Sequence, residues 1–156
     1  MKLEWRKQDK ELYLPGKKPV QVDVPAQKFF AIDGTGNPNE EDFSLRVGAL
    51  YAYTWTLKMM PKGGFIPEGY EEYTVYPLEG VWDGTDDWDA STPLNKEKLV
   101  YTIMVRQPDF LTQETFARVV GEVTRKKDQP FLDEVRFVEI ADGSCVQMLH
   151  IGPYDY

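Results

Sequence analysis

One carboxylate in this sequence lies among aromatic side chains. Glu79 stands in residues 77–82, PLEGVW, near the end of an expected strand, and Tyr73 and Tyr76 precede it closely. A carboxylate in such surroundings has a perturbed pKa or attracts a cation. Three roles therefore stay open for Glu79: a surface charge, recognition of a cationic ligand, and acid–base catalysis.

Aromatic residues are the second chemical signal. They make up 13% of the chain, and nine of them fall within residues 51–88. Most of these nine are Tyr or Trp, whose polar atoms need a partner or water. The pattern is typical either of a Tyr-rich sheet face or of an aromatic-lined pocket. We expect Tyr51, Trp55, Tyr73 and Trp82 to supply stacking surfaces for a ligand.

Two further patterns carry weaker signals. Gly34-Thr35-Gly36 has only two glycines of a dinucleotide-binding motif, and no parallel βαβ pattern follows it, so we interpret it as a turn before a helix. Cys145 and His150 are the only residues of their types. Their spacing of five would place them on opposite faces of a strand, which argues against a nucleophile–base pair.

Metal and cofactor sites are not expected. A single Cys and a single His do not make a usual zinc site. The acidic residues Asp83, Asp86, Asp87 and Asp89 fit no calcium-loop spacing, and we interpret them as a solvated loop. No cofactor is predicted.

Composition narrows the class of partner. With 18 basic and 26 acidic residues the net charge is −8, which disfavours nucleic acid and favours a cationic or neutral ligand. The longest basic cluster, residues 125–127, lies at an expected helix end, where it complements the dipole. No apolar run is long enough to span a bilayer, and the charged N-terminus has no signal-peptide core. We therefore predict a cytoplasmic protein with one domain, residues 1–156.

Hydrophobic periodicity predicts an α+β fold, with helices on one face of a largely antiparallel sheet. Residues 1–18 are expected to form a short helix or arm. Asn39 and Thr112 are the expected N-caps of the two long helices. The expected strands are 20–24, 28–33, 70–78 and 98–106, the helices run from 39 to 60 and from 112 to 127, and 135–140 and 145–151 form a hairpin.

Four segments in this order carry a family resemblance: residues 29–39, 77–82, 106–110 and 146–154. Together they resemble the stand-alone branch of the GyrI-like small-molecule-binding domains, over essentially the whole chain. The resemblance implies an SHS2-type fold, in which two β-α-β-β units are related by a pseudo-twofold axis with a ligand cleft between them. Residues 30–34 and 148–152 are the matching strand-to-glycine segments of this repeat.

The resemblance also implies activities. Relatives fused to DNA-binding helices sense lipophilic, often cationic, drugs, and some stand-alone relatives are hydrolases that open strained cyclopropane rings of alkylating compounds. No helix-turn-helix module is present here, which disfavours a transcription factor. Members of this type extend to a last strand with a Glu in a His-Glu-Ile-Tyr-like run. This sequence ends at Tyr156 without a match, so we expect an incomplete second unit that lacks its helix and last strands.

The leading hypothesis is a domain that binds lipophilic aromatic small molecules, cations included, in an aromatic-lined cleft with a carboxylate. The alternative is a detoxifying hydrolase of cyclopropane-bearing compounds, with Glu79 as the catalytic residue; a protein-interaction domain is the third. Besides the four aromatic residues above, the expected ligand-binding residues include Thr102, which the repeat places where the other unit has its Glu, and His150. A homodimer is left open.

Overall fold

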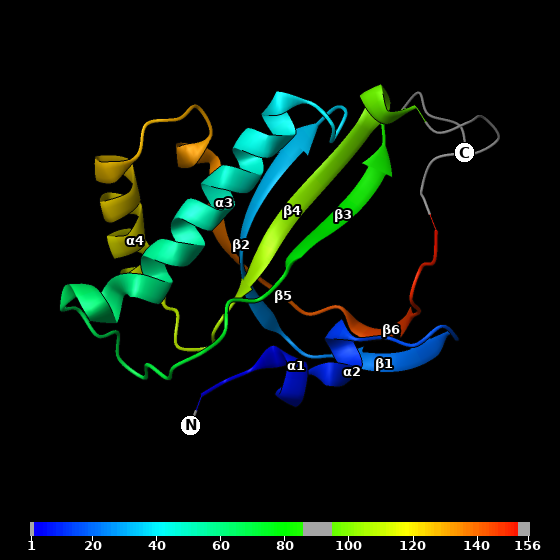
Figure 1. The fold of residues 1–156 in the computed structure, drawn as a ribbon, viewed down its shortest axis with the longest axis horizontal. Coiled ribbons are helices and arrows are strands. Elements are labelled where there is room, and N and C mark those ends of the chain that lie inside the picture. Colours follow the sequence, from blue (N-terminus) through cyan, green and yellow to red (C-terminus); the bar gives the residue numbers. More distant parts are fainter. Residues whose placement is uncertain (1, 86–94, 153–156) are drawn as a thin grey trace.

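The computed structural model describes residues 2–85 and 95–152 (Figure 1). Their main elements follow the predicted order β, β, α, β, β, α, β, β, preceded by two short helices. The elements are α1 (Trp5–Gln8), α2 (Lys10–Tyr13), β1 (Val20–Val24), β2 (Gln27–Thr35), α3 (Glu41–Met59), β3 (Leu78–Gly84), β4 (Leu99–Gln107), α4 (Gln113–Lys126), β5 (Arg136–Ile140) and β6 (Gly143–Gln147).

The strands form two antiparallel sheets. The larger sheet has the order β3-β4-β2-β5, and the smaller one consists of β1 and β6. Helices α3 and α4 lie on the same face of the larger sheet, with α3 running along β2 and β4 (Figure 1). The α+β class and the helices on one face are confirmed, while the pseudo-twofold relation and the cleft between two units stay predictions.

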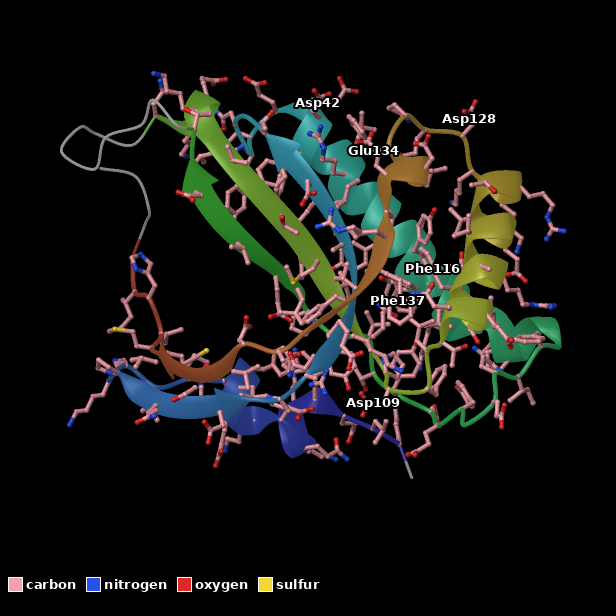
Figure 2. All side chains as sticks on the ribbon, turned by 180° about the vertical axis from the view of Figure 1, so that it is seen from behind. Asp42, Asp109, Phe116, Asp128, Glu134 and Phe137 are labelled. Carbon is pink, nitrogen blue, oxygen red and sulfur yellow. The ribbon has the colours of Figure 1, made fainter. Side chains whose placement is uncertain are left out.

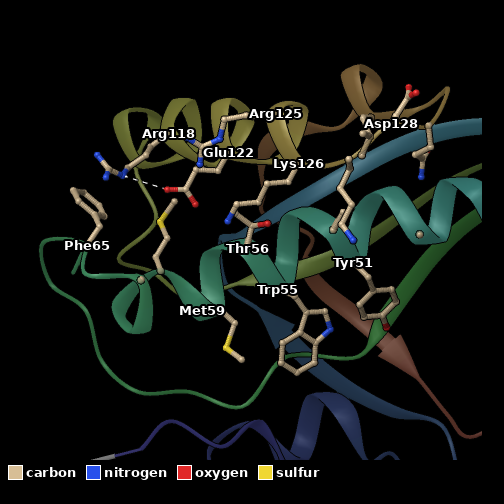
Figure 3. Close-up of a pocket in the computed structure, with 17 residues that line it drawn as sticks. Tyr51, Trp55, Thr56, Met59, Phe65, Arg118, Glu122, Arg125, Lys126 and Asp128 are labelled. Carbon is tan, nitrogen blue, oxygen red and sulfur yellow. Dashed lines mark ion pairs between the residues drawn. The ribbon is translucent and has the colours of Figure 1, made fainter.

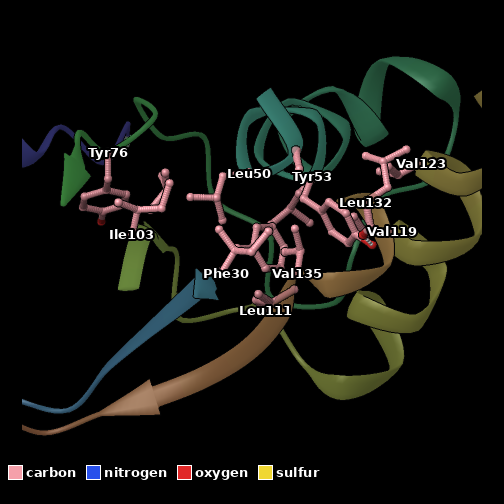
Figure 4. Packing of buried hydrophobic residues seen from close by; sticks show 14 of the residues in the cluster. Phe30, Leu50, Tyr53, Tyr76, Ile103, Leu111, Val119, Val123, Leu132 and Val135 are labelled. Atoms are coloured by element: carbon pink, nitrogen blue, oxygen red, sulfur yellow. Dashed lines mark hydrogen bonds between the residues drawn. The ribbon is translucent and has the colours of Figure 1, made fainter. Parts of the chain in front are cut away.

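The core lies between the larger sheet and the two helices. Side chains alternate along β4, so Tyr101, Ile103 and Val105 face the helices, while Thr102, Met104 and Arg106 face away. Fully buried side chains of the core come from both layers, and Figure 4 labels seven of them: Phe30, Leu50, Tyr53, Ile103, Leu111, Val119 and Val123.

Aromatic contacts join the helices to the sheet. The Phe30 ring lies 5.7 Å from both Tyr53 of α3 and Phe116 of α4, measured between ring centroids. Phe116 also contacts Phe137 of β5 at 5.8 Å, and Figure 2 shows these two rings side by side between α4 and the sheet. Much of the aromatic content therefore serves the core.

The predicted strand at 70–78 is wrong, because the strand begins only at Leu78. Residues 70–77 run irregularly, with one bridge between Tyr73 and Leu3. The N-terminal arm supplies their partners: Leu3 donates its N–H to the Glu72 carbonyl, and the Trp5 indole donates to the Val75 carbonyl at 2.9 Å. These long-range bonds replace a strand ladder.

The predicted hairpin between 135–140 and 145–151 is also wrong. Strand β5 pairs with β2, with Phe137 opposite Phe30, whereas β6 pairs with β1, with Cys145 opposite Val22. The chain passes directly from one sheet to the other, and Gly143 takes a φ of +70° that favours glycine at this change of direction. Pairing with β2 also packs Val138 and Ile140 of β5 against the buried side chains behind the sheet.

The two predicted N-caps differ in outcome. The Thr112 hydroxyl accepts a hydrogen bond from the Thr115 N–H at 3.2 Å, so this cap is confirmed. Helix α3 instead follows Glu40, which makes no side-chain cap. The Asn39 N–H donates to the Asn37 side chain at 2.9 Å, and Asn39 therefore belongs to the preceding turn.

Candidate functional site

Trp82 belongs to an aromatic cluster on the helix side of the larger sheet. Its ring centroid lies 4.9 Å from that of Tyr101 and 5.8 Å from that of Phe43 at the start of α3. The indole lies back over Gly80, where an added Cβ would come within 2.6 Å of its Nε1 atom. The Trp82 side chain is 43% exposed, so the cluster presents an indole that is held on one side and open on the other.

Tyr51 and Trp55 lie on α3. Trp55 is 49% exposed and Tyr51 is half-buried. Both line a groove of about 760 Å³ between α3 and α4, called here the α3–α4 groove. Figure 3 shows their rings on the side of α3 turned away from α4, so they form its outer edge. Among the described residues, the structure thus leaves the indoles of Trp55 and Trp82 accessible on the helix side of the protein.

Glu79 faces the other way. It is three residues from Trp82 on the same strand, and alternation therefore places it on the opposite face of the sheet, level with Met104 of β4. Its Oε2 atom is buried without a hydrogen-bond partner among the described residues. Burial raises the pKa of the Glu79 carboxyl and Asp142 adds to the rise, while the charge of Arg106 and the Tyr13 hydroxyl oppose it.

Arg106 organises the polar surroundings of Glu79. Its guanidinium lies 4.8 Å from the ring centroid of Tyr76 and forms an ion pair with Asp9 at 3.3 Å. The side chain is only 11% exposed. The Tyr13 hydroxyl is buried beside it without a well-formed hydrogen bond to a described residue, and burial raises the pKa of Tyr13 strongly. We call Glu79, Arg106, Tyr13 and Asp9 the Glu79 cluster.

Three of the four members of this cluster, Arg106, Tyr13 and Asp9, were not predicted as site residues from the sequence. Tyr13 and Asp9 come from the N-terminal arm, which is far from Glu79 along the chain. Arg106 could have been found from the sequence, because alternation along β4 places it on the outward face of the strand together with Thr102 and Met104. No comparable pattern pointed to the arm.

Tyr73 is the predicted ligand contact that the structure buries most deeply. It is 1% exposed and lies in the core beneath the irregular segment. The Lys58 ammonium lies 4.6 Å from its ring centroid, and burial raises the pKa of the Tyr73 hydroxyl strongly. In this structure a ligand has no access to the ring.

Thr102 and His150 lie apart from the accessible indoles of Trp55 and Trp82. The Thr102 hydroxyl donates to Asp33 Oδ1 at 2.5 Å, and the same carboxylate pairs with Arg136 across the sheet. The Arg136 guanidinium and this hydroxyl lower the pKa of Asp33, which sequence reasoning did not single out. His150 is exposed and follows the end of β6.

Of the acidic residues considered for a metal, Asp86, Asp87 and Asp89 fall outside the described part of the structure. Within residues 2–85 and 95–152, no three His, Cys, Asp or Glu side chains gather as a metal site would require. In the same residues, no helix combines the length and the apolar character needed to cross a bilayer.

Concave sites edged by aromatic side chains are where proteins commonly bind small molecules, and the α3–α4 groove of this α+β domain has such an edge. The sequence profile of the GyrI-like small molecule binding domain matches residues 17–156, and the chain therefore belongs to the GyrI-like family. No curated protein sequence matches it.

Solved structures are also similar to this chain over nearly its whole length. A hydrolase from Listeria innocua is 33% identical, with a TM-score of 0.85 over 97% of this chain and 75% of its own. A structure of a Listeria innocua hydrolase with 34% identity has a TM-score of 0.88 over 99% of this chain and 74% of its own. An uncharacterized conserved protein of the same bacterium is also 34% identical, with a TM-score of 0.87 over 97% and 73%.

Proposed function

We propose that this protein binds lipophilic aromatic small molecules against the accessible indoles of Trp55 and Trp82. The observation that carries the proposal is the exposure of these two side chains, at 49% and 43%, on one side of the protein. A half-exposed indole offers a flat apolar surface for a ligand. The Trp82 indole is also held by the rings of Phe43 and Tyr101, so it loses little freedom on binding.

The family and the charge support this proposal. The GyrI-like family is a small-molecule-binding one, and the net charge of −8 favours cations among flat aromatic ligands. A ligand cation over an indole adds about 0.5–2 kcal/mol, depending on how far it is desolvated. The Glu79 carboxylate lies behind the sheet, so it does not contribute a direct contact to a ligand stacked on Trp82.

Replacing Trp82 tests the proposal directly. We expect Trp82→Ala to weaken binding of a planar phenanthridinium dye about tenfold, because one ring-stacking contact is lost. Dye fluorescence titration measures the affinity. Val20→Ala, which truncates an exposed side chain of β1, is the control and should bind like the unaltered protein. Equal affinity in Trp82→Ala and in Val20→Ala would refute the role of Trp82.

Hydrolysis is a second candidate function, favoured by the hydrolases of Listeria innocua at 33–34% identity. Glu79 is half-buried, and burial raises the pKa of its carboxyl, which makes it a stronger base than an exposed carboxylate. In this proposal Glu79 accepts a proton from water while the water oxygen bonds to a cyclopropane carbon. The strained carbon–carbon bond breaks, its electrons pass to a conjugated carbonyl oxygen, and a proton ends there.

Glu79→Gln tests the second candidate. The protein is incubated with a cyclopropane-bearing alkylating compound, and mass spectrometry follows the product that has gained one water. We expect turnover to fall at least a hundredfold in Glu79→Gln, in line with the loss of a general base, and to stay unchanged in Glu139→Gln, an exposed carboxyl of β5. Equal turnover in the two variants would remove Glu79 from the reaction, and heat-denatured protein controls for spontaneous addition.

A further inference from the structure

The α3–α4 groove is positively charged on an acidic protein. Six charged side chains line it, four basic and two acidic: Arg118, Arg125, Lys126, Lys127, Glu122 and Asp128. The protein as a whole carries −8. The groove therefore has the opposite sign from its surroundings.

Within the described part of the chain, Arg118 is the one basic side chain of the groove that forms an ion pair or a ring contact. Arg118 forms an ion pair with Glu122 at 3.7 Å, and its guanidinium lies 3.7 Å from the ring centroid of Phe65. Arg125 and Lys126 form no ion pair with any residue in the described ranges. Figure 3 shows Lys126 reaching from α4 toward Thr56 of α3 across the groove.

The helix dipole accounts for part of this charge. The C-terminus of α4 carries the equivalent of about half a negative charge, which one or two of these cations satisfy. Residues 125–127 supply three, and Arg118 lies two turns earlier along the helix. A surplus of positive charge is left over the groove.

The rest of the lining is apolar or small. Gly48, Ala52 and Thr56 are spaced four residues apart and therefore lie on one face of α3. Because their side chains are small, they leave space between α3 and α4. Met60 and Leu132 are buried beneath. A volume of about 760 Å³ lies in the range of small-molecule sites.

We infer that the α3–α4 groove binds amphipathic organic anions: ligands with an apolar aromatic or aliphatic body that lies along Ala52 and Thr56, and a carboxylate or sulfonate that meets Arg125 and Lys126. The proposed function concerns the indoles of Trp55 and Trp82 and favours cations, whereas this inference concerns the basic side of the groove and favours anions. Of the two indoles, only Trp55 borders the groove, at its outer edge.

Two fluorescent probes of nearly the same shape test it. Anilinonaphthalene sulfonate carries an anion, and phenylnaphthylamine is the same ring system without it. We expect the sulfonate to bind more tightly, with an affinity that falls as salt is added, while the uncharged probe stays insensitive to salt. The double variant Arg125→Gln/Lys126→Gln should weaken the sulfonate about tenfold and leave the uncharged probe unchanged.

Two further variants keep the test decisive. Lys17→Gln/Lys18→Gln removes the same charge from an exposed segment outside the groove and should leave both affinities unchanged. Ala52→Leu fills the groove and should weaken both probes. Equal binding of the two probes, or sulfonate binding that is lost in Trp82→Ala but kept in Arg125→Gln/Lys126→Gln, would overturn the inference while leaving the proposed function standing.

Discussion

Replacing Arg106 with Met is expected to lower the free energy of unfolding by about 3 kcal/mol at pH 7, because removing one partner leaves buried charge uncompensated. Arg106 is 11% exposed and pairs with Asp9, and its charge also stabilises the ionised form of Glu79. Met fills a similar volume without the charge. Urea denaturation measures the change. The matched control is Arg118→Met, whose exposed pair with Glu122 on α4 should cost less than about 1 kcal/mol.

The pH dependence separates charge from packing in this variant. The folded-state pKa of Glu79 is already raised above its ordinary value, and losing Arg106 raises it further. The folded protein then holds a proton that the unfolded chain has released, so stability is greatest below the ordinary Glu pKa and falls as the pH rises through the folded-state value. Arg106→Met should therefore regain part of its loss at acid pH. A deficit that is the same at every pH would show that packing on Tyr76, and not charge, explains it.

Gly34→Ala is expected to destabilise the protein by about 2–3 kcal/mol through overpacking. A Cβ at this position would lie 2.4 Å from the Tyr101 hydroxyl oxygen and 2.6 Å from a ring carbon. The Tyr101 ring is 3% exposed and contacts Phe43 at 5.4 Å between centroids. It therefore cannot move aside without disturbing its contacts with Phe43 and Trp82. Chemical denaturation, followed by Trp fluorescence, measures the loss.

Two comparisons sharpen this second prediction. Gly121→Ala in α4 meets nothing within 4 Å and should stabilise the protein by about 0.5–1 kcal/mol, because Ala is the better helix former. In a Tyr101→Ala background, Gly34→Ala should cost almost nothing, since the obstructing ring is gone. If Gly34→Ala still lowered the free energy of unfolding in the Tyr101→Ala background, the cause would be strain in the backbone of β2 and not a clash with the Tyr101 ring.

The elements with a clear hydrophobic periodicity were predicted correctly from the sequence. The alternation of β4 and the apolar stripe of α4 with its Thr112 cap lie where periodicity predicted them, since each depends on residues close together in the chain. The family followed from four short segments in order, and residues 17–156 confirm it. Alternation places Glu79 and Trp82 on opposite faces of the sheet if both residues lie in one strand. The structure was needed to show this, because the predicted strand ended at residue 78 whereas β3 begins at Leu78.

Tertiary structure decided what depends on distant partners. The N-terminal arm holds residues 70–77 out of a strand, brings Tyr13 and Asp9 to Arg106, and so builds the Glu79 cluster from parts far apart in sequence. Strands β5 and β6 join different sheets although they follow one another directly. A strand's partner is set by which pairing buries the most apolar surface over the whole chain, and local propensity does not carry that information. The sequence by itself thus determined the class and the family, while the tertiary structure decided which of the candidate side chains meet.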